Sequence, residues 1–136
     1  MHPNKATHRD HMHINTYEGN GRLAGKFLNW NIISISMDLP PTDLKDPSVA
    51  YVDLEELEFP LVIRPWQEGD RFVPFGMSHF KKLSDYLVDE KYALPKKAAT
   101  LVVETNGHIA CILGGRVDQR FAISKASTQA LRIENT

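Results

Sequence analysis

The chain has 136 residues, 42% of them hydrophobic, which is enough for one hydrophobic core and too little for two full domains. Its 16 Lys and Arg nearly balance its 17 Asp and Glu, and its single cysteine, Cys111, excludes an intrachain disulfide and a zinc site built on cysteines. No apolar run approaches the roughly 18 residues of a membrane helix, and the polar N-terminus lacks the apolar core of a secretory signal. We therefore expect a soluble, cytoplasmic protein without a membrane partner.

The charges are unevenly distributed along the chain. Residues 1–63 contain five Lys and Arg against nine Asp and Glu, whereas residues 64–125 contain ten against seven. The front of the chain is thus net acidic and the middle is net basic, which would direct a polyanionic partner to the middle.

The N-terminal residues 1–26 are polar and rich in histidine and glycine. We predict an N-terminal extension here that can be mobile, followed by a single domain over residues 27–136. Within the extension, residues 17–25 predict a tight turn or a solvated loop. Four early histidines are interpreted as surface residues in preference to a transition-metal site, so no metal site is assigned: His2, His8, His11 and His13.

The first part of the domain predicts two strands. Residues 27–37 alternate apolar and polar side chains, as in a strand with one buried face. Residues 38–48 carry three prolines and three aspartates and predict a loop, and residues 49–54 predict the second strand. Asp53 is placed to cap a short helical turn that follows this strand.

The stretch from Leu61 to Asp89 carries the densest pattern of turn residues and charges. It begins with a short apolar strand that should end before Pro65, because proline cannot donate a hydrogen bond to a neighbouring strand. Two turns follow, and from Lys82 onward apolar residues recur at helical spacing. We expect four residues to shape the two loops: Gly69, Asp70, Pro74 and Gly76.

The last part of the chain predicts a helix and more strands. Residues 93–99 predict a short helix with proline in its first turn, and residues 101–104 and 108–113 predict a hairpin around an Asn-Gly turn. Residues 121–123 and 130–133 predict two further short strands. Since strands outnumber helices and follow one another without helical crossovers, the predicted fold class is α+β, a mostly antiparallel β-sandwich with one or two short helices.

Catalytic patterns are weak, and we assign no catalytic residue. The P-loop pattern is absent, and Cys111 lies within an apolar run, as a small buried residue does. Ser84, Asp85 and His79 are neighbours in sequence, but the start of a helix accounts for them better than a hydrolase site does.

The residues that favour binding are cations at strand ends, turns and the start of a helix. Long cationic side chains at such positions reach outward, and arginine forms bidentate contacts with phosphate. The alternative is a solvated surface with local ion pairs, such as Arg71 with Asp70 or Arg116 with Asp118. For Trp66, Phe75 and Phe80 we favour packing over stacking on an unpaired base. The predicted RNA-binding residues are Arg64, Arg71, Lys81, Lys82, Arg116 and Arg120.

One segment resembles a known family. The order Arg-Pro-x-x-x-Gly-Asp-Arg-Phe-x-Pro-x-Gly-Met at 64–77 is followed by Lys-Lys-Leu-Ser-Asp-Tyr-Leu at 81–87 and Gly-Gly-Arg-Val-Asp at 114–118. This order is similar to the C-terminal domain of bacterial tRNA(Ile)-lysidine synthase, and the likeness covers about residues 59–133. One departure is Lys96-Lys97, where the family often carries an arginine, so a bidentate contact there is in doubt.

The resemblance implies a β-sandwich shared with the phenylalanyl-tRNA synthetase β-subunit and a role in holding tRNA(Ile) by its acceptor stem. In the parent enzyme it implies ligation of lysine to the wobble cytidine of the anticodon, with ATP and Mg as cofactors. The family's Ser-Gly-Gly-x-Asp-Ser loop is absent from these residues, so we expect the N-terminal catalytic domain to lie outside them, no cofactor to bind here, and this chain alone to be inactive.

A second function remains open from the residues alone. The β face could dock on another domain or on a second copy of the chain as a homodimer, with edge strands around Phe27–Met37 and no direct RNA contact. The two functions differ in salt dependence, because phosphate binding weakens steeply with salt and apolar docking does not.

Overall fold

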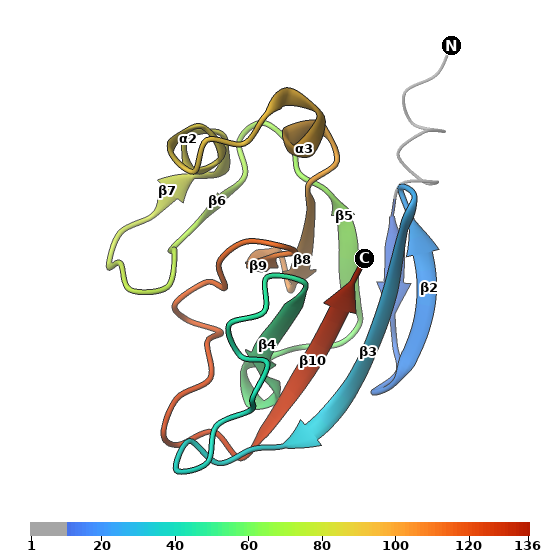
Figure 1. The fold of residues 1–136 in the computed structure, drawn as a ribbon, viewed down its shortest axis with the longest axis vertical. Helices are drawn as coiled ribbons and strands as arrows, with labels where there is room; N and C mark the ends of the chain where they lie inside the picture. The colour runs from blue at the N-terminus through green and yellow to red at the C-terminus, as the bar shows by residue number, and fades with distance from the viewer. Residues whose placement is uncertain (1–10) are drawn as a thin grey trace.

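The computed structural model describes residues 11–136, which fold into two four-stranded antiparallel sheets packed face to face (Figure 1). The first sheet has the order β1-β5-β8-β9, with β1 (Met12–Ile14), β5 (Leu61–Pro65), β8 (Leu101–Thr105) and β9 (His108–Ile112). The second has the order β2-β3-β10-β4, with β2 (Gly19–Leu23), β3 (Lys26–Ser34), β10 (Gln129–Asn135) and β4 (Val49–Asp53). The predicted α+β sandwich is confirmed.

The main hydrophobic core lies between the two sheets. Ile63 and Val103 from the first sheet and Leu28, Leu131 and Ile133 from the second are fully buried in one cluster. Successive side chains of a strand point to opposite faces, so β10 supplies this core with Leu131 and Ile133, and β5 supplies Leu61 and Ile63.

The other face of the first sheet is covered by a helix and a small hairpin. The hairpin consists of β6 (Arg71–Phe72) and β7 (Lys81–Lys82), and the chain passes directly from β7 into α2 (Leu83–Asp89). As the helical spacing predicts, α2 buries Leu83, Tyr86 and Leu87, which pack in a second cluster with β8 and β9. A further short helix is α3 (Leu94–Ala98), and a 3-10 turn is η1 (Leu54–Glu56). In residues 11–136 no helix is long and apolar enough to cross a membrane.

Two local predictions are confirmed in detail. The β8–β9 hairpin turns through Asn106 (φ 47°) and Gly107 (φ 80°), the paired positive angles that favour Asn-Gly. The Asp53 side chain accepts a hydrogen bond of 3.1 Å from the Glu55 N–H, so it caps η1 as expected.

The N-terminal region differs from its prediction as an extension over residues 1–26. Residues 12–14 form β1, which pairs with β5, and residues 19–23 form β2, which pairs with β3. Each of these strands buries a single residue, Ile14 in β1 and Leu23 in β2, so the sequence shows no alternating pattern that would predict a strand. Both become strands because they pair with neighbouring strands. His2 and His8 lie outside the described residues.

Three further strand predictions need correction. Residues 121–123 form no strand and make only a single bridge, from Ala122 to Val52. β3 lies between β2 and β10, so it offers no free edge for docking. The strand that starts at Leu61 extends through Pro65, which pairs with Leu101 although it has no N–H to donate.

Candidate nucleic-acid interface

The loop between β6 and β7 is held in place by the segment after β9. The Phe75 N–H donates to the Val117 carbonyl at 2.9 Å, and the Gln119 N–H donates to the Val73 carbonyl at 2.7 Å. Pro74 is buried and forms a bridge with Asp118. Residues 73–76 therefore run beside residues 117–119 like a short strand pair, although the two segments are more than 40 positions apart in sequence.

Asp118 is the anchor of this arrangement. Its carboxylate is completely buried and accepts the backbone N–H groups of Val73 and Arg120, both at 2.8 Å. The same carboxylate accepts the Arg120 guanidinium through Nε at 3.0 Å and Nη2 at 2.9 Å. These hydrogen bonds raise the pKa of Arg120 and fix the direction in which its half-exposed side chain points.

The two loops bring together a group that we call the cation–aromatic cluster: Arg71, Phe80, Lys82 and Arg120. The guanidinium carbons of Arg71 and Arg120 each lie 5.0 Å from the centroid of the Phe80 ring, within the range of a cation–π interaction. Arg71 is paired across the hairpin with Lys82, so these two side chains share one face of the hairpin, and Phe80 is the loop residue that directly precedes β7. The cluster therefore presents three cations and an exposed ring on one surface.

Arg64 is placed differently from the other predicted cations. It is 8% exposed, donates to both Asp70 oxygens at 3.0 Å, and donates through Nε to Glu104 at 2.9 Å. Burial opposes the charge of the guanidinium, but these hydrogen bonds outweigh it and the pKa of Arg64 is raised. Asp70 also accepts the Gln67 N–H at 2.7 Å, and its carbonyl accepts the Leu83 N–H at the start of α2. Arg64 thus fits a structural role better than the phosphate contact that the sequence predicts.

Lys81 and Arg116 lie beside α2, away from the ring of Phe80. Lys81 forms an ion pair with Asp89, and Arg116 lies 3.8 Å from the Glu90 carboxylate with about half of its side chain exposed. Arg116 thus faces Glu90 at the end of α2 and not Asp118, the partner considered from the sequence, which proposed no partner for Lys81.

The predicted loop-shaping residues lie at the bends. Gly69 (φ +93°) and Gly76 (φ +90°) adopt left-handed backbone angles that strain any side chain. The Gly76 N–H donates to the Gln119 side chain at 2.7 Å, which links the tip of the β6–β7 loop to the segment after β9.

The lysines of α3 form a second cationic site. The Lys96 ammonium lies 4.2 Å from the centroid of the Tyr92 ring, and the Lys97 ammonium lies 5.7 Å from the Trp66 ring. Burial, and to a lesser extent the nearby charge of Lys96, lowers the pKa of Lys26 on β3. Trp66 itself packs against the second core cluster and donates its indole N–H to the Lys97 carbonyl, so it is a structural residue as predicted.

Sequence reasoning missed the roles of Phe80, Phe75 and Asp118. We predicted packing for both phenylalanines, yet Phe75 and Phe80 are 54% and 51% exposed. Asp118 pairs with Arg120 and not with Arg116. The only available signal was an aspartate two positions from an arginine on either side, which does not distinguish the two partners.

Cys111 is not suited to nucleophilic catalysis. Cys111 is fully buried, and burial raises the pKa of its thiol to about 12, so it is not a nucleophile at neutral pH. Within residues 11–136 no three His, Cys, Asp or Glu side chains are grouped so that they could hold a metal ion.

Fold and site together define a class of protein, a small antiparallel β-sandwich domain that presents a cation–aromatic surface on its outer hairpin. Residues 61–134 match the family model described as the TilS substrate C-terminal domain. This match covers more than half of the chain, and the chain belongs to that family.

Curated relatives agree with this assignment. The chain is 38% identical over 104 residues, or 76% of its length, to the tRNA(Ile)-lysidine synthase of Parabacteroides distasonis. It is 36% identical over 87 residues to the tRNA(Ile)-lysidine synthase of Bacteroides thetaiotaomicron. The matched regions span 23% and 20% of these two relatives, so the chain corresponds to about a fifth of their length.

Two solved structures share the fold. A crystal structure of a TilS C-terminal domain matches with a TM-score of 0.74 at 18% identity, covering 93% of this chain and 96% of that one. An N-terminal fragment of the phenylalanyl-tRNA synthetase β-subunit from Pyrococcus horikoshii matches with a TM-score of 0.61 at 10% identity, covering 79% and 38%. At these identities the two likenesses support the fold alone.

Proposed function

We propose that the chain is the tRNA-binding domain of a tRNA(Ile)-lysidine synthase and that it holds tRNA(Ile) by the acceptor stem. The observation that carries the proposal is the cation–aromatic cluster. Arg71 and Lys82 are exposed and form no ion pair with any residue in 11–136, so their charges are available to phosphates. Arg120 adds a third cation whose direction Asp118 fixes.

The chemistry of the cluster suits structured RNA. Proteins recognise double-stranded RNA mainly by its shape and through phosphate and ribose contacts, for which a fixed spacing of cations is sufficient. The Phe80 ring, 5.0 Å from the guanidinium carbons of Arg71 and Arg120, holds these two planar groups, on which a base at an RNA end can stack. Lys81 and Arg116 carry further positive charge beside α2, where each lies next to a carboxylate.

The ligation chemistry of such an enzyme is proposed to belong to a catalytic domain outside these residues. This proposal is supported by the sequence, in which neither a P-loop nor the Ser-Gly-Gly-x-Asp-Ser loop is found. We therefore propose that this domain contributes affinity and orientation for tRNA in the cytoplasm.

Direct binding tests the proposal. Labelled tRNA(Ile) is titrated with the chain at 50 and 200 mM salt, using the wild type and the double variant Arg71→Ala plus Lys82→Ala. We expect the double variant to bind at least about tenfold more weakly, since two charge-assisted contacts are lost. Its dependence of log K on log salt should also be shallower by about one for each lost phosphate contact.

A matched control removes two exposed cations elsewhere, in the variant Arg22→Ala plus Lys125→Ala. This control has the same net charge as the test variant and should bind almost like the wild type. Equal losses in both double variants would mean that net charge and not the cluster determines binding. Unchanged binding in the test variant would refute the proposed surface.

The second candidate, a docking module, is favoured by the exposure of Phe75 and Met77 in the β6–β7 loop. Two exposed apolar side chains in one loop suit packing against another domain. This function predicts no salt-dependent tRNA binding by the folded chain, so the titration above separates the two candidates.

A further inference from the structure

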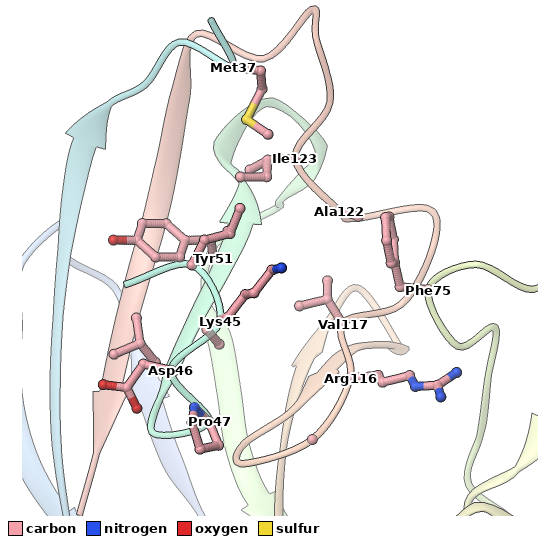
Figure 2. Close-up of a pocket in the computed structure, with 14 residues that line it drawn as sticks. Met37, Lys45, Asp46, Pro47, Tyr51, Phe75, Arg116, Val117, Ala122 and Ile123 are labelled. Carbon is pink, nitrogen blue, oxygen red and sulfur yellow. The ribbon is translucent and has the colours of Figure 1, made fainter. Parts of the chain in front are cut away.

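A pocket of about 310 Å³ reaches the β6–β7 loop at Phe75 (Figure 2). It lies between the segment 44–51 and the segment 115–123, and Phe75 from the β6–β7 loop closes one side. Most of its lining is apolar and includes Met37, Val117 and Ile123. This size is at the lower end of the range for small-molecule sites, and an apolar wall with few polar groups is their usual composition.

The polar groups of the pocket are distributed unequally. Figure 2 shows Lys45 directed from the 44–47 loop across the pocket, and it forms no ion pair with any residue in 11–136. Arg116 lies at the opposite margin with its guanidinium turned outward, on the side of Glu90. The Asp46 carboxylate is engaged internally, accepting the Ser48 N–H at 2.9 Å and the Ser48 hydroxyl at 2.8 Å.

The remaining polar wall residue is also satisfied. The Tyr51 hydroxyl donates to Asp43, which accepts Arg132 at 2.7 Å as well. Hydrogen bonds from Tyr51 and then from Arg132 lower the pKa of Asp43, so this carboxylate stays ionised within its own network. Asp46 also stays ionised, because hydrogen bonds from Ser48 lower its pKa, but Figure 2 shows its carboxylate turned away from Lys45. The charge directed into the pocket is therefore the positive charge of Lys45.

We propose that this pocket takes one unpaired nucleotide of the bound RNA, with the base against the apolar wall and Phe75 and with its phosphate at Lys45. The proposal rests on the proposed RNA-binding function. A nucleotide combines a flat, largely apolar body with an adjacent negative charge, which matches one apolar cavity with one free ammonium group.

Continuity with the cluster favours RNA as the source of this nucleotide. Phe75 and Phe80 belong to the same loop, and Arg116 lies at the mouth of the pocket with its guanidinium turned outward. A strand that leaves the pocket can therefore pass Arg116 at the mouth or follow the β6–β7 loop from Phe75 toward Phe80. The domain would then prefer RNA that has an unpaired end or bulge next to a helix.

The experiment compares two RNAs with an identical helix, one blunt and one with a short single-stranded extension at one end that carries 2-aminopurine. We expect the wild type to bind the extended RNA about tenfold more tightly, the scale of one stacked base, and to change the 2-aminopurine fluorescence. Lys45→Ala and Ala122→Phe, which fills the pocket, should reduce this ratio to nearly one and leave blunt binding unchanged. Lys125→Ala serves as the charge-matched control and should keep the ratio, and thermal unfolding verifies that each variant is folded.

The outcomes are distinguishable. Equal binding of both RNAs by the wild type, or a ratio unaffected by both pocket variants, overturns this inference while leaving the RNA-binding function intact. Failure to bind either RNA overturns both. Adenosine monophosphate that binds as tightly as the extended RNA would identify a free nucleotide as the ligand. If Ala122→Phe changes the mass in sedimentation and both RNAs bind equally, the pocket accommodates a second copy of the chain and the proposal is wrong.

Discussion

Replacing Arg64 by Met removes the one guanidinium that two carboxylates share. Asp70 and Glu104 would keep their negative charges, with side chains only 12% and 28% exposed, and lose the cation that compensates them. The variant therefore tests whether Arg64 holds the fold together or contacts RNA. It is the predicted RNA-binding residue whose structural placement differs most from the expectation.

The magnitude follows from the geometry. Breaking a buried ion pair by removing one partner costs about 3–5 kcal/mol, and the lower value applies because Glu104 is partly solvated and Asp70 keeps the hydrogen bond from Gln67. With a urea dependence of about 1.5 kcal/mol/M, a loss of about 3 kcal/mol lowers the midpoint of unfolding by about 2 M. Arg64→Lys keeps the charge but loses the bidentate geometry, so its midpoint of unfolding should lie between those of the wild type and Arg64→Met.

Urea unfolding followed by tryptophan fluorescence measures the stability of each variant, and tRNA titration under folding conditions measures binding. We expect Arg64→Met to lose stability while its folded form keeps the salt dependence of tRNA binding. The double variant Arg64→Met plus Asp70→Leu should recover part of the loss, because an apolar pair leaves one buried charge fewer. The reasoning fails if Arg64→Met unfolds like the wild type and binds tRNA more weakly with a shallower salt dependence.

Other positions give independent tests. Asp118→Asn should cost about 2 kcal/mol of unfolding free energy and weaken tRNA binding, because the Arg120 side chain loses its anchor; unchanged binding in the folded variant would contradict this role. Gly19→Ala should cost about 1–3 kcal/mol in thermal unfolding, because the new methyl group would lie 2.6 Å from the Trp30 ring; a neutral result would mean that the ring moves freely. The lowered pKa of Asp43 makes its contribution to stability present above about pH 4 and lost as the pH falls through the folded-state value. The difference in unfolding free energy between wild type and Asp43→Asn should therefore shrink from pH 6 to pH 2. A difference that grows over this range would contradict a lowered pKa of Asp43.

Features with local physical causes were predictable from the sequence. The Asn106–Gly107 turn depends on two adjacent residues that tolerate positive φ, and the Asp53 cap depends on a side chain two positions from its donor. The apolar spacing of α2 is likewise complete within one short segment. Predictions of this kind were correct because the residues that interact lie within a few positions of one another in the sequence.

Features that depend on distant partners were not predictable. β1 carries a single buried residue, Ile14, and becomes a strand because β5 offers it a free edge. The ring of Phe80 could not be distinguished from a core residue until the loops around it were placed. The pocket beside Lys45 is formed by four segments that no sequence pattern connects: Met37, 44–51, Phe75 and 115–123.

The sequence by itself determined the fold class, the family resemblance and the set of cations that can meet a polyanion. Only the tertiary structure decided which cations are available to a partner. Arg64 donates a hydrogen bond to Glu104, 40 positions away, whereas Arg71 and Lys82 remain exposed. The physical reason is that residue type and local spacing set a side chain's charge and backbone preference, whereas burial and pairing depend on which segments the sandwich brings together.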